Sequence, residues 1–318
     1  MTAAISESQA RRFAALRDSM AAVSGLLEDG RTIEIMLNAD GQVWVERVGG
    51  GMVAVTRMNR DDAFRMLRLV ATELGLELGE RSPSISGKLP IWGARIQASI
   101  PPVVDGPVFA LRKPARTVFT LEDYVAQQIL SPEQAQILRS AVRARRNILV
   151  GGGTGTGKTT FANALLAELA ELDERIFLVE DNPELQCAAP NRLQVLVQPP
   201  HYPWRRAILD ALRFRPDRIV VGEVRDGAAL DLIKAWNTGH PGGIATLHAD
   251  STPLMLDRLC QLIEEVIPQA PRALVAQTIH LCVHLERDMN HPARRRVTGI
   301  DRVVGLGRSG EWSLERAA

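Results

Sequence analysis

A chain of 318 residues is long enough for about two domains of ordinary size, each able to bury its own core. Its composition, 46% hydrophobic and 24% charged, is typical of a globular protein, and the net charge of +1 provides no strong field for attracting nucleic acid. The three cysteines, Cys187, Cys260 and Cys282, are widely separated, which argues against a disulfide framework and against a zinc site.

Residues 1–12 are polar and alanine-rich and lack the apolar core of a signal peptide. No run along the chain reaches the roughly 18 apolar residues that a membrane span needs. We therefore expect a cytoplasmic protein, which partners could still hold peripherally at a membrane.

The first part of the chain is predicted to be a mixed α/β domain. Apolar residues at helical spacing predict a helix over residues 8–27 and another over residues 61–74, where Gly75 suits a C-terminal cap. Residues 33–37 and 42–46 alternate like strands and flank a turn signal, which predicts a hairpin.

A stretch interrupted by prolines divides the chain. We predict a linker at residues 114–119, between an N-terminal domain of residues 1–115 and a larger domain of residues 116–318. Beyond the linker, Ser131 opens a capping box followed by proline, which predicts a helix that runs to about Arg145.

Strand and helix patterns alternate in the larger domain. Strands are predicted at residues 148–150, 175–180, 218–222 and 243–248, and helices at residues 160–171, 204–212 and 227–238. This alternation predicts an α/β fold with a largely parallel sheet covered by helices, in which ligands bind at the carboxyl ends of the strands.

The most informative motif follows the first of these strands. Residues 152–159 read G-x-x-x-x-G-K-T, the pattern of a loop that wraps backbone N–H groups around phosphates at a helix N-terminus. The five glycines between Gly151 and Gly157 each cost roughly 0.5–1 kcal/mol relative to alanine, so a plain connector is the weaker interpretation. We expect a nucleoside triphosphate to contact Gly153, Thr154, Gly155, Thr156, Gly157, Lys158, Thr159 and Thr160, with Lys158 on the terminal oxygens and Thr159 on Mg²⁺.

Carboxylates follow two other predicted strands. Glu223 ends one of them and can polarise an attacking water, while Gly222 stands where an aspartate is usual, so Mg²⁺ would depend more on Thr159, waters or other acids. Glu180 and Glu184 follow another strand, and either could be a metal ligand or orient water. The plainer alternative is a solvated strand end with a helix cap.

Two histidines surround a glycine-rich turn before the last predicted strand. A lone histidine such as His240 is more often a structural residue. His248 stands at a strand end, where it could interact with the γ-phosphate and couple hydrolysis to movement. Neither has zinc-site spacing. A GTP switch is disfavoured because the sequence holds no NKxD run.

The four segments together resemble the secretion traffic ATPases that drive type II secretion, type IV pili and type IV secretion. GGTGTGKTT resembles their Walker A motif, RIFLVEDNPEL their Asp box, LRFRPDRIVVGEVRD their Walker B motif and NTGHPGGIATLHAD their His box, in the same order. Residues 34–47 resemble the N-terminal domain of the type IV secretion branch, and residues 185–191 are most similar to its conjugal transfer ATPases.

The resemblance implies an ATP-hydrolysing, Mg²⁺-dependent RecA-like domain in a homo-hexameric ring, where the smaller N-terminal domain caps the nucleotide. Inner-membrane components of a conjugation or secretion apparatus would be its partners, without strong direct nucleic-acid binding. It implies catalytic roles for Lys158, Glu223, Glu180, Glu184 and His248, and metal binding by Thr159 and Glu180. It also implicates Arg213, Arg95 and Arg112 at the phosphates, with surface ion pairs as the alternative.

Other functions remain open from sequence: assembly of type IV pili or type II secretion, a RecA-type or helicase-type nucleic-acid motor, and a nucleotide-gated switch or scaffold without turnover. The 4% aromatic content argues against base-stacking grooves. The arginine runs at residues 143–146 and 294–296 are interpreted as solvated faces.

Overall fold

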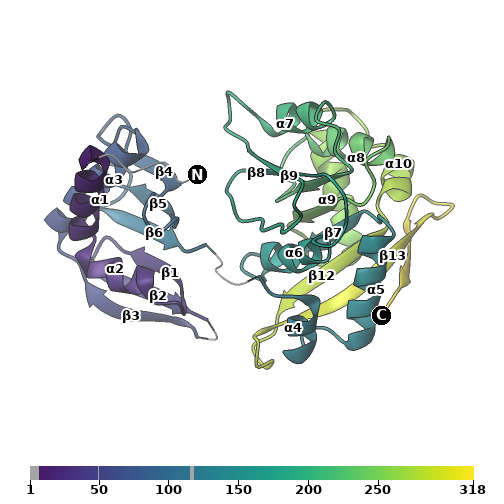
Figure 1. Cartoon of the computed structure of the whole chain (residues 1–318), viewed down its shortest axis with the longest axis horizontal. Coiled ribbons are helices and arrows are strands. Elements are labelled where there is room, and N and C mark those ends of the chain that lie inside the picture. The colour runs from purple at the N-terminus through teal and green to yellow at the C-terminus, as the bar shows by residue number, and fades with distance from the viewer. Residues whose placement is uncertain (1–6, 49, 115–117) are drawn as a thin grey trace. The chain divides into compact units, whose positions relative to one another are not determined.

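The computed structural model describes residues 7–48, 50–114 and 118–318. The chain divides into two compact units, Met1–Arg116 and Thr117–Ala318, which are described separately (Figure 1). The predicted linker spans this boundary, and its residues 115–117 lie outside the described part of the chain.

The first unit is an antiparallel sheet with helices along one face (Figure 1). Its helices are α1 (Glu7–Ser19), α2 (Ala21–Glu28) and α3 (Arg60–Leu74). Its strands follow the order β3-β2-β1-β6-β5-β4, with bounds β1 (Thr32–Leu37), β2 (Gln42–Arg47), β3 (Met52–Arg57), β4 (Ser84–Lys88), β5 (Arg95–Ser99) and β6 (Val108–Arg112). Helices and strands share one core, in which Leu16, Val70 and Ile35 are completely buried.

The predicted hairpin is confirmed, and so is the helix α3, whose C-cap Gly75 is left-handed at φ 67°. The single helix predicted over residues 8–27 is wrong in one respect, because the helix breaks at Met20, whose ψ of 11° lies outside the helical range. Leu16 and Val23 on either side of the break still face the same core. Strand β3 was not predicted. All its residues are exposed, so it shows no alternation of burial.

The second unit is an eight-stranded sheet in the order β14-β13-β12-β7-β11-β10-β8-β9 (Figure 1). The strands are β7 (Ile148–Gly151), β8 (Ile176–Glu180), β9 (Arg192–Leu196), β10 (Arg218–Val221), β11 (Ile244–Leu247), β12 (Leu281–Arg287), β13 (Arg295–Leu306) and β14 (Trp312–Arg316). All neighbours from β12 to β9 pair in parallel, and only β13 and β14 are antiparallel.

Helices cover both faces of this sheet, because alternate strand residues enter two separate cores. The helices are α4 (Leu121–Ala126), α5 (Pro132–Arg143), α6 (Lys158–Ala167), α7 (Trp204–Ala211), α8 (Ala229–Asn237), α9 (Thr252–Glu264) and α10 (Arg272–Thr278). Ile148 and Val150 pack with α4, α5 and α6, whereas Leu149 packs with α7 to α10. The capping box at Ser131 is confirmed, and its helix α5 ends at Arg143.

Asn147 forms hydrogen bonds with the segments that precede β11 and β12, at the edge of the sheet where β7 begins. Its buried side chain donates to the Thr278 carbonyl at 2.8 Å and accepts from the N–H groups of Gly242 and Gly243 at 2.7 and 3.0 Å. Its own N–H donates to Nδ1 of His280 at 3.0 Å. One side chain thus sets the start of β7 between β11 and β12.

We expect Asn147→Ala to lower the free energy of unfolding of the second unit by about 3 kcal/mol, because it leaves two buried N–H groups and a buried carbonyl without partners. Urea denaturation followed by circular dichroism measures this change. Asn290→Ala, at an exposed turn, is the control and should stay within about 0.5 kcal/mol of the unsubstituted protein. Equal effects of the two substitutions would contradict the role given to Asn147.

Candidate functional site

The predicted functional segments meet at one edge of the second sheet. The glycine loop follows β7, His248 follows β11, Glu223 follows β10 and Asp181 follows β8. Since these strands are consecutive neighbours and parallel, their carboxyl ends lie side by side. The order of the sheet therefore aligns the four segments, which are far apart in the sequence.

The glycine loop has a backbone that side chains would obstruct. Gly155 and Gly157 adopt φ of 71° and 93°, in the left-handed region that favours glycine. Helix α6 begins directly after Gly157, and among the described residues no side chain caps its N-terminus. Its first N–H groups and its dipole are thus directed at the loop, which is the arrangement that binds phosphate.

Lys158 is almost completely buried beneath this loop. Its ammonium donates to the carbonyls of Gly152 and Gly153, both at 2.9 Å, and lies 3.3 Å from Nδ1 of His248. The loop is therefore connected through Lys158 to the neighbouring strand end.

His248 continues this connection toward Glu223. Its Nε2 lies 2.8 Å from Oε1 of Glu223, and Nε of Arg225 donates to the other Glu223 oxygen at 2.5 Å. Arg225 also bonds to Asp181 beyond β8. The result is a continuous series of polar contacts from Lys158 through His248, Glu223 and Arg225 to Asp181, which we call the edge series.

The surroundings of His248 favour its neutral form. Burial, followed by the nearby Lys158 ammonium, lowers the pKa of His248 below its ordinary value of 6.5, although Glu223 opposes the shift. A neutral ring accepts at one nitrogen and donates at the other, so Nδ1 accepts from Lys158 and the Nε2 proton is donated to Glu223.

Two features constrain the backbone on either side of Glu223. The buried Thr246 donates its hydroxyl to the Gly222 carbonyl at 2.6 Å and accepts at its own carbonyl from the Val224 N–H at 2.8 Å. A Cβ at Gly222 would lie 3.0 Å from Cβ of Glu180, which is tighter than ordinary contact. A side chain at position 222 would therefore press against Glu180.

Glu180 makes bonds within the protein that the sequence did not predict. One oxygen of its buried carboxylate accepts from the N–H groups of Glu184 and Leu185 at 2.8 and 2.9 Å, and the other accepts from Gln194. Burial raises the pKa of Glu180, against the effect of these donors. These bonds fold the segment that follows β8, and metal binding by Glu180 stays a prediction.

Asn163 attaches this segment to α6, a contact that sequence reasoning missed. Its buried side chain donates to the Glu184 carbonyl at 3.0 Å and accepts from the Gln186 N–H at 2.9 Å. The Glu184 carboxylate itself makes no hydrogen bond with another described side chain. Asn163 therefore connects α6 directly to the acidic segment.

Of three predicted arginines, only Arg213 lies in the same unit as the edge series. Arg213 is exposed between α7 and β10, at the opposite edge of the sheet from the glycine loop. Arg95 and Arg112 belong to the first unit, where they stand directly opposite each other on β5 and β6.

The arginine runs are not simple solvated faces, as the sequence had indicated. Arg145 bonds to Glu174 at 2.7 Å, together with the completely buried Arg218. These two guanidiniums lower the pKa of Glu174, although burial alone would raise it. Arg295 lies against the glycine loop, since a Cβ at Gly157 would lie 3.6 Å from its Cζ and closer still to Nη1.

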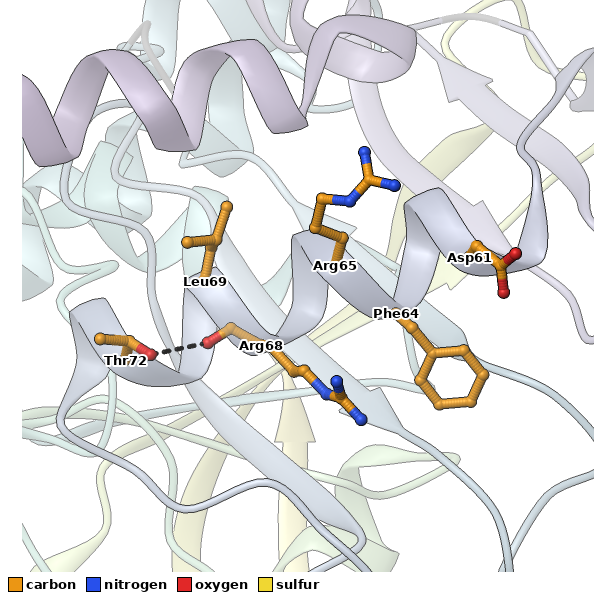
Figure 2. A pocket seen from close by; sticks show the side chains of 6 residues that line it. All are labelled: Asp61, Phe64, Arg65, Arg68, Leu69 and Thr72. Carbon is orange, nitrogen blue, oxygen red and sulfur yellow. Dashed lines mark hydrogen bonds between the residues drawn. The ribbon is translucent and has the colours of Figure 1, made fainter.

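The edge series does not coincide with the hollow that the structure shows on α3. A hollow of about 480 Å³ lies on α3 in the first unit and is lined by Asp61, Phe64, Arg65, Arg68, Leu69 and Thr72 (Figure 2). Figure 2 shows Arg65 and Arg68 pointing in different directions, with no convergent set of polar groups. Chemistry and strand topology, rather than the shape of the surface, therefore identify the candidate site.

Within the described ranges, no three His, Cys, Asp or Glu side chains are grouped as a metal cage. A magnesium ion at this site would thus depend on phosphate oxygens, as is usual for nucleotide-bound Mg²⁺. Thr159 fits such an ion, because it lies in the first turn of α6 and its hydroxyl has no hydrogen-bond partner among the described residues.

A model of the Type II/IV secretion system protein family matches residues 18–310. The chain belongs to this family, and the resemblance inferred from the motifs is confirmed at this level. Among the described helices, none is both long and apolar enough to cross a membrane.

The chain is also similar to individual proteins. The chain is 43% identical over 277 residues to the conjugal transfer protein TrbB of Rhizobium radiobacter, covering 86% of this chain and 85% of that protein. It is 31% identical over 289 residues to the type IV secretion system protein VirB11 of Bartonella henselae, covering 76% and 79%. Its structure resembles the ATPase DotB of Legionella pneumophila with a TM-score of 0.60 over 93% of this chain and 79% of that one, a likeness of fold alone at 18% identity.

The edge series predicts how the His248 pKa responds to its neighbours. Lys158→Ala should raise this pKa and Glu223→Gln should lower it, because the first removes a nearby cation and the second an anion. Histidine NMR titration measures both shifts, with His248→Asn to assign the signal. Lys234→Ala, an exposed lysine on α8, is the control and should have no effect.

The same geometry gives a stability effect. Because the folded pKa of His248 is below 6.5, the unfolded chain binds a proton more readily as pH falls below 6.5, so protonation of this residue costs stability there. His248→Asn should therefore reduce the loss of stability on acidification. An unchanged His248 pKa in Lys158→Ala would contradict the contact between the two side chains.

Proposed function

We propose that this chain is a Mg²⁺-dependent ATP hydrolase that powers a conjugative type IV secretion apparatus. The observation that carries the proposal is the edge series, which connects the lysine of a phosphate-binding loop through His248 to the carboxylate of Glu223. A structural role alone would not require a buried lysine directed at glycine carbonyls beside an open helix N-terminus.

In the proposed reaction, the loop N–H groups and Lys158 hold the phosphates of ATP and offset the charge that develops on them. Glu223 orients the water that attacks the γ-phosphorus in line, and the bond to the leaving β-γ bridging oxygen breaks. A magnesium ion held through Thr159 would neutralise charge on the phosphates. Neutral His248 lies between Lys158 and Glu223. It would therefore connect the lysine that holds the terminal phosphate with the acid that orients the water.

The larger unit is proposed to be a RecA-like domain in a homo-hexamer. Arg213 lies at the opposite edge of its own sheet from the glycine loop, so it would act only at the site of a neighbouring subunit. Arg95 and Arg112 place two like charges opposite each other on adjacent strands, and Glu34, opposite Arg112 on β1, is one anion near them. We propose a nucleotide phosphate as a second anion for this pair.

The names of the relatives support the biological setting. TrbB is named for conjugal transfer and VirB11 for type IV secretion, and this chain covers most of the length of each. We propose by extension that the protein acts at the cytoplasmic face of the inner membrane with components of the apparatus. Assembly of type IV pili or type II secretion, and a nucleic-acid motor, are the alternative functions.

Lys158→Ala should weaken ATP binding and reduce hydrolysis at least about 100-fold, because a central charge contact to the phosphates is lost. Glu223→Gln should reduce hydrolysis to a similar extent while ATP binding is retained, because only the water loses its orienting group. Phosphate release and calorimetric ATP titration measure the two properties. Steady turnover in either variant would contradict the proposed roles, and a lack of turnover in the unsubstituted protein would favour a switch.

The alternatives make different predictions for the same preparation. Hydrolysis stimulated by single-stranded DNA, with steeply salt-dependent binding, would indicate a nucleic-acid motor. In cells that lack the gene, the unsubstituted protein should restore plasmid transfer. Lys158→Ala should not restore it. Restoration of pilus formation or of protein secretion without plasmid transfer would contradict the conjugative assignment.

A further inference from the structure

Strand β12 extends beyond the end of β7 and runs beside the glycine loop. Gly151, the last residue of β7, pairs with His284, so residues 285–287 continue past it. A Cβ at Gly152 would lie 3.3 Å from the Leu285 carbonyl carbon, which shows how closely the two backbones approach. The hairpin formed by β12 and β13 thus flanks the loop on the side away from β11.

Two arginines of this hairpin contact the loop glycines. A Cβ at Gly155 would lie 3.2 Å from Cζ of Arg287, and a Cβ at Gly157 would lie 3.6 Å from Cζ of Arg295. The two arginines are register partners on β12 and β13, so their guanidiniums approach the loop together. Either glycine with a side chain would exclude its arginine from the loop.

Neither guanidinium has a carboxylate partner among the residues that the structure describes. Arg295 makes a single long hydrogen bond of 3.4 Å, to the Ala293 carbonyl, whereas Arg296 next to it bonds to Asp288 at 3.3 Å. Two like charges directly opposite each other on a sheet are destabilising without a counter-ion. Their common neighbour is a loop whose N–H groups suit an anion.

We infer that Arg287 and Arg295 bind the α- and β-phosphates of the nucleotide, an inference that rests on the function proposed above. Glu223, which acts at the γ-phosphate, lies beyond β11 on one side of the loop, and the hairpin lies on the other. The phosphate chain passes between them, so the arginines lie on the side of the α- and β-phosphates and Glu223 on the side of the γ-phosphate. They contribute to affinity for ADP and ATP alike, because both nucleotides carry the α- and β-phosphates.

Calorimetric titration of the full chain with ADP and with a non-hydrolysable ATP analogue tests this inference. Arg287→Gln and Arg295→Gln should each raise both dissociation constants about tenfold or more and by similar factors, since each removes a charge-assisted contact to phosphate. KM for ATP should rise by a similar factor, and any fall in kcat should be smaller than the rise in KM. Arg296→Gln is the matched control, because this arginine belongs to the same hairpin but pairs with Asp288.

The outcomes separate the inference from the proposed function. If the unsubstituted protein binds ADP and Lys158→Ala does not, while Arg287→Gln and Arg295→Gln bind normally, the inference is wrong and the proposed function stands. An effect on the ATP analogue without one on ADP, or a fall in kcat with KM unchanged, also overturns the inference. If the unsubstituted protein binds no nucleotide, both are overturned. Thermal unfolding of each variant without nucleotide verifies that the hairpin is intact.

Discussion

The position of β7 between β11 and β12 is the constraint on which the rest of the structure depends. Parallel pairing on both sides brings the glycine loop next to His248 on one flank and next to Arg287 on the other. Asn147 maintains this arrangement from the opposite end of β7, where its side chain and backbone bond to the starts of both neighbours. A shift of one strand by a residue would separate the loop from the groups that surround it.

The acidic residues of the site divide their roles according to burial. Glu180 is buried and uses its oxygens to fold the segment after β8 around backbone N–H groups. Glu223 is held by His248 and Arg225 at the edge of the sheet, where a ligand could reach it. Carboxylates that look equivalent in sequence thus differ in function, because a buried carboxylate must satisfy its oxygens within the protein.

Helix α6 is bonded to the segments that follow two different strands. Asn163 of α6 bonds to the segment after β8, and Lys158 at the start of α6 contacts His248 after β11. Helix α6 is thus bonded to segments that follow strands on both sides of β10. The proposed ring motor would use these bonds to convert phosphate binding and release into movement between subunits.

In the second unit, strands β7, β8, β10 and β11 and helices α6, α7 and α8 were predictable because buried strands and amphipathic helices leave strong local patterns, whereas β9 and β12 to β14 were not predicted. Helices α3 and α5 were predicted within about two residues for the same reason, since their caps are formed by neighbouring residues in the chain. Prediction was weaker where a segment lacks contrast between its two faces. The exposed strand β3 and the break at Met20 are examples.

The sequence by itself determined the family, the position of the glycine loop and the identity of the acids and histidine near it, because each depends on residue types at short spacing. Only the tertiary structure decided that Glu180 is internally bonded, that Arg213 lies at the far edge of the sheet and that Arg287 and Arg295 contact the loop. These facts follow from strand order and from contacts between residues more than 100 positions apart, such as Arg287 and Gly155, which no local pattern encodes.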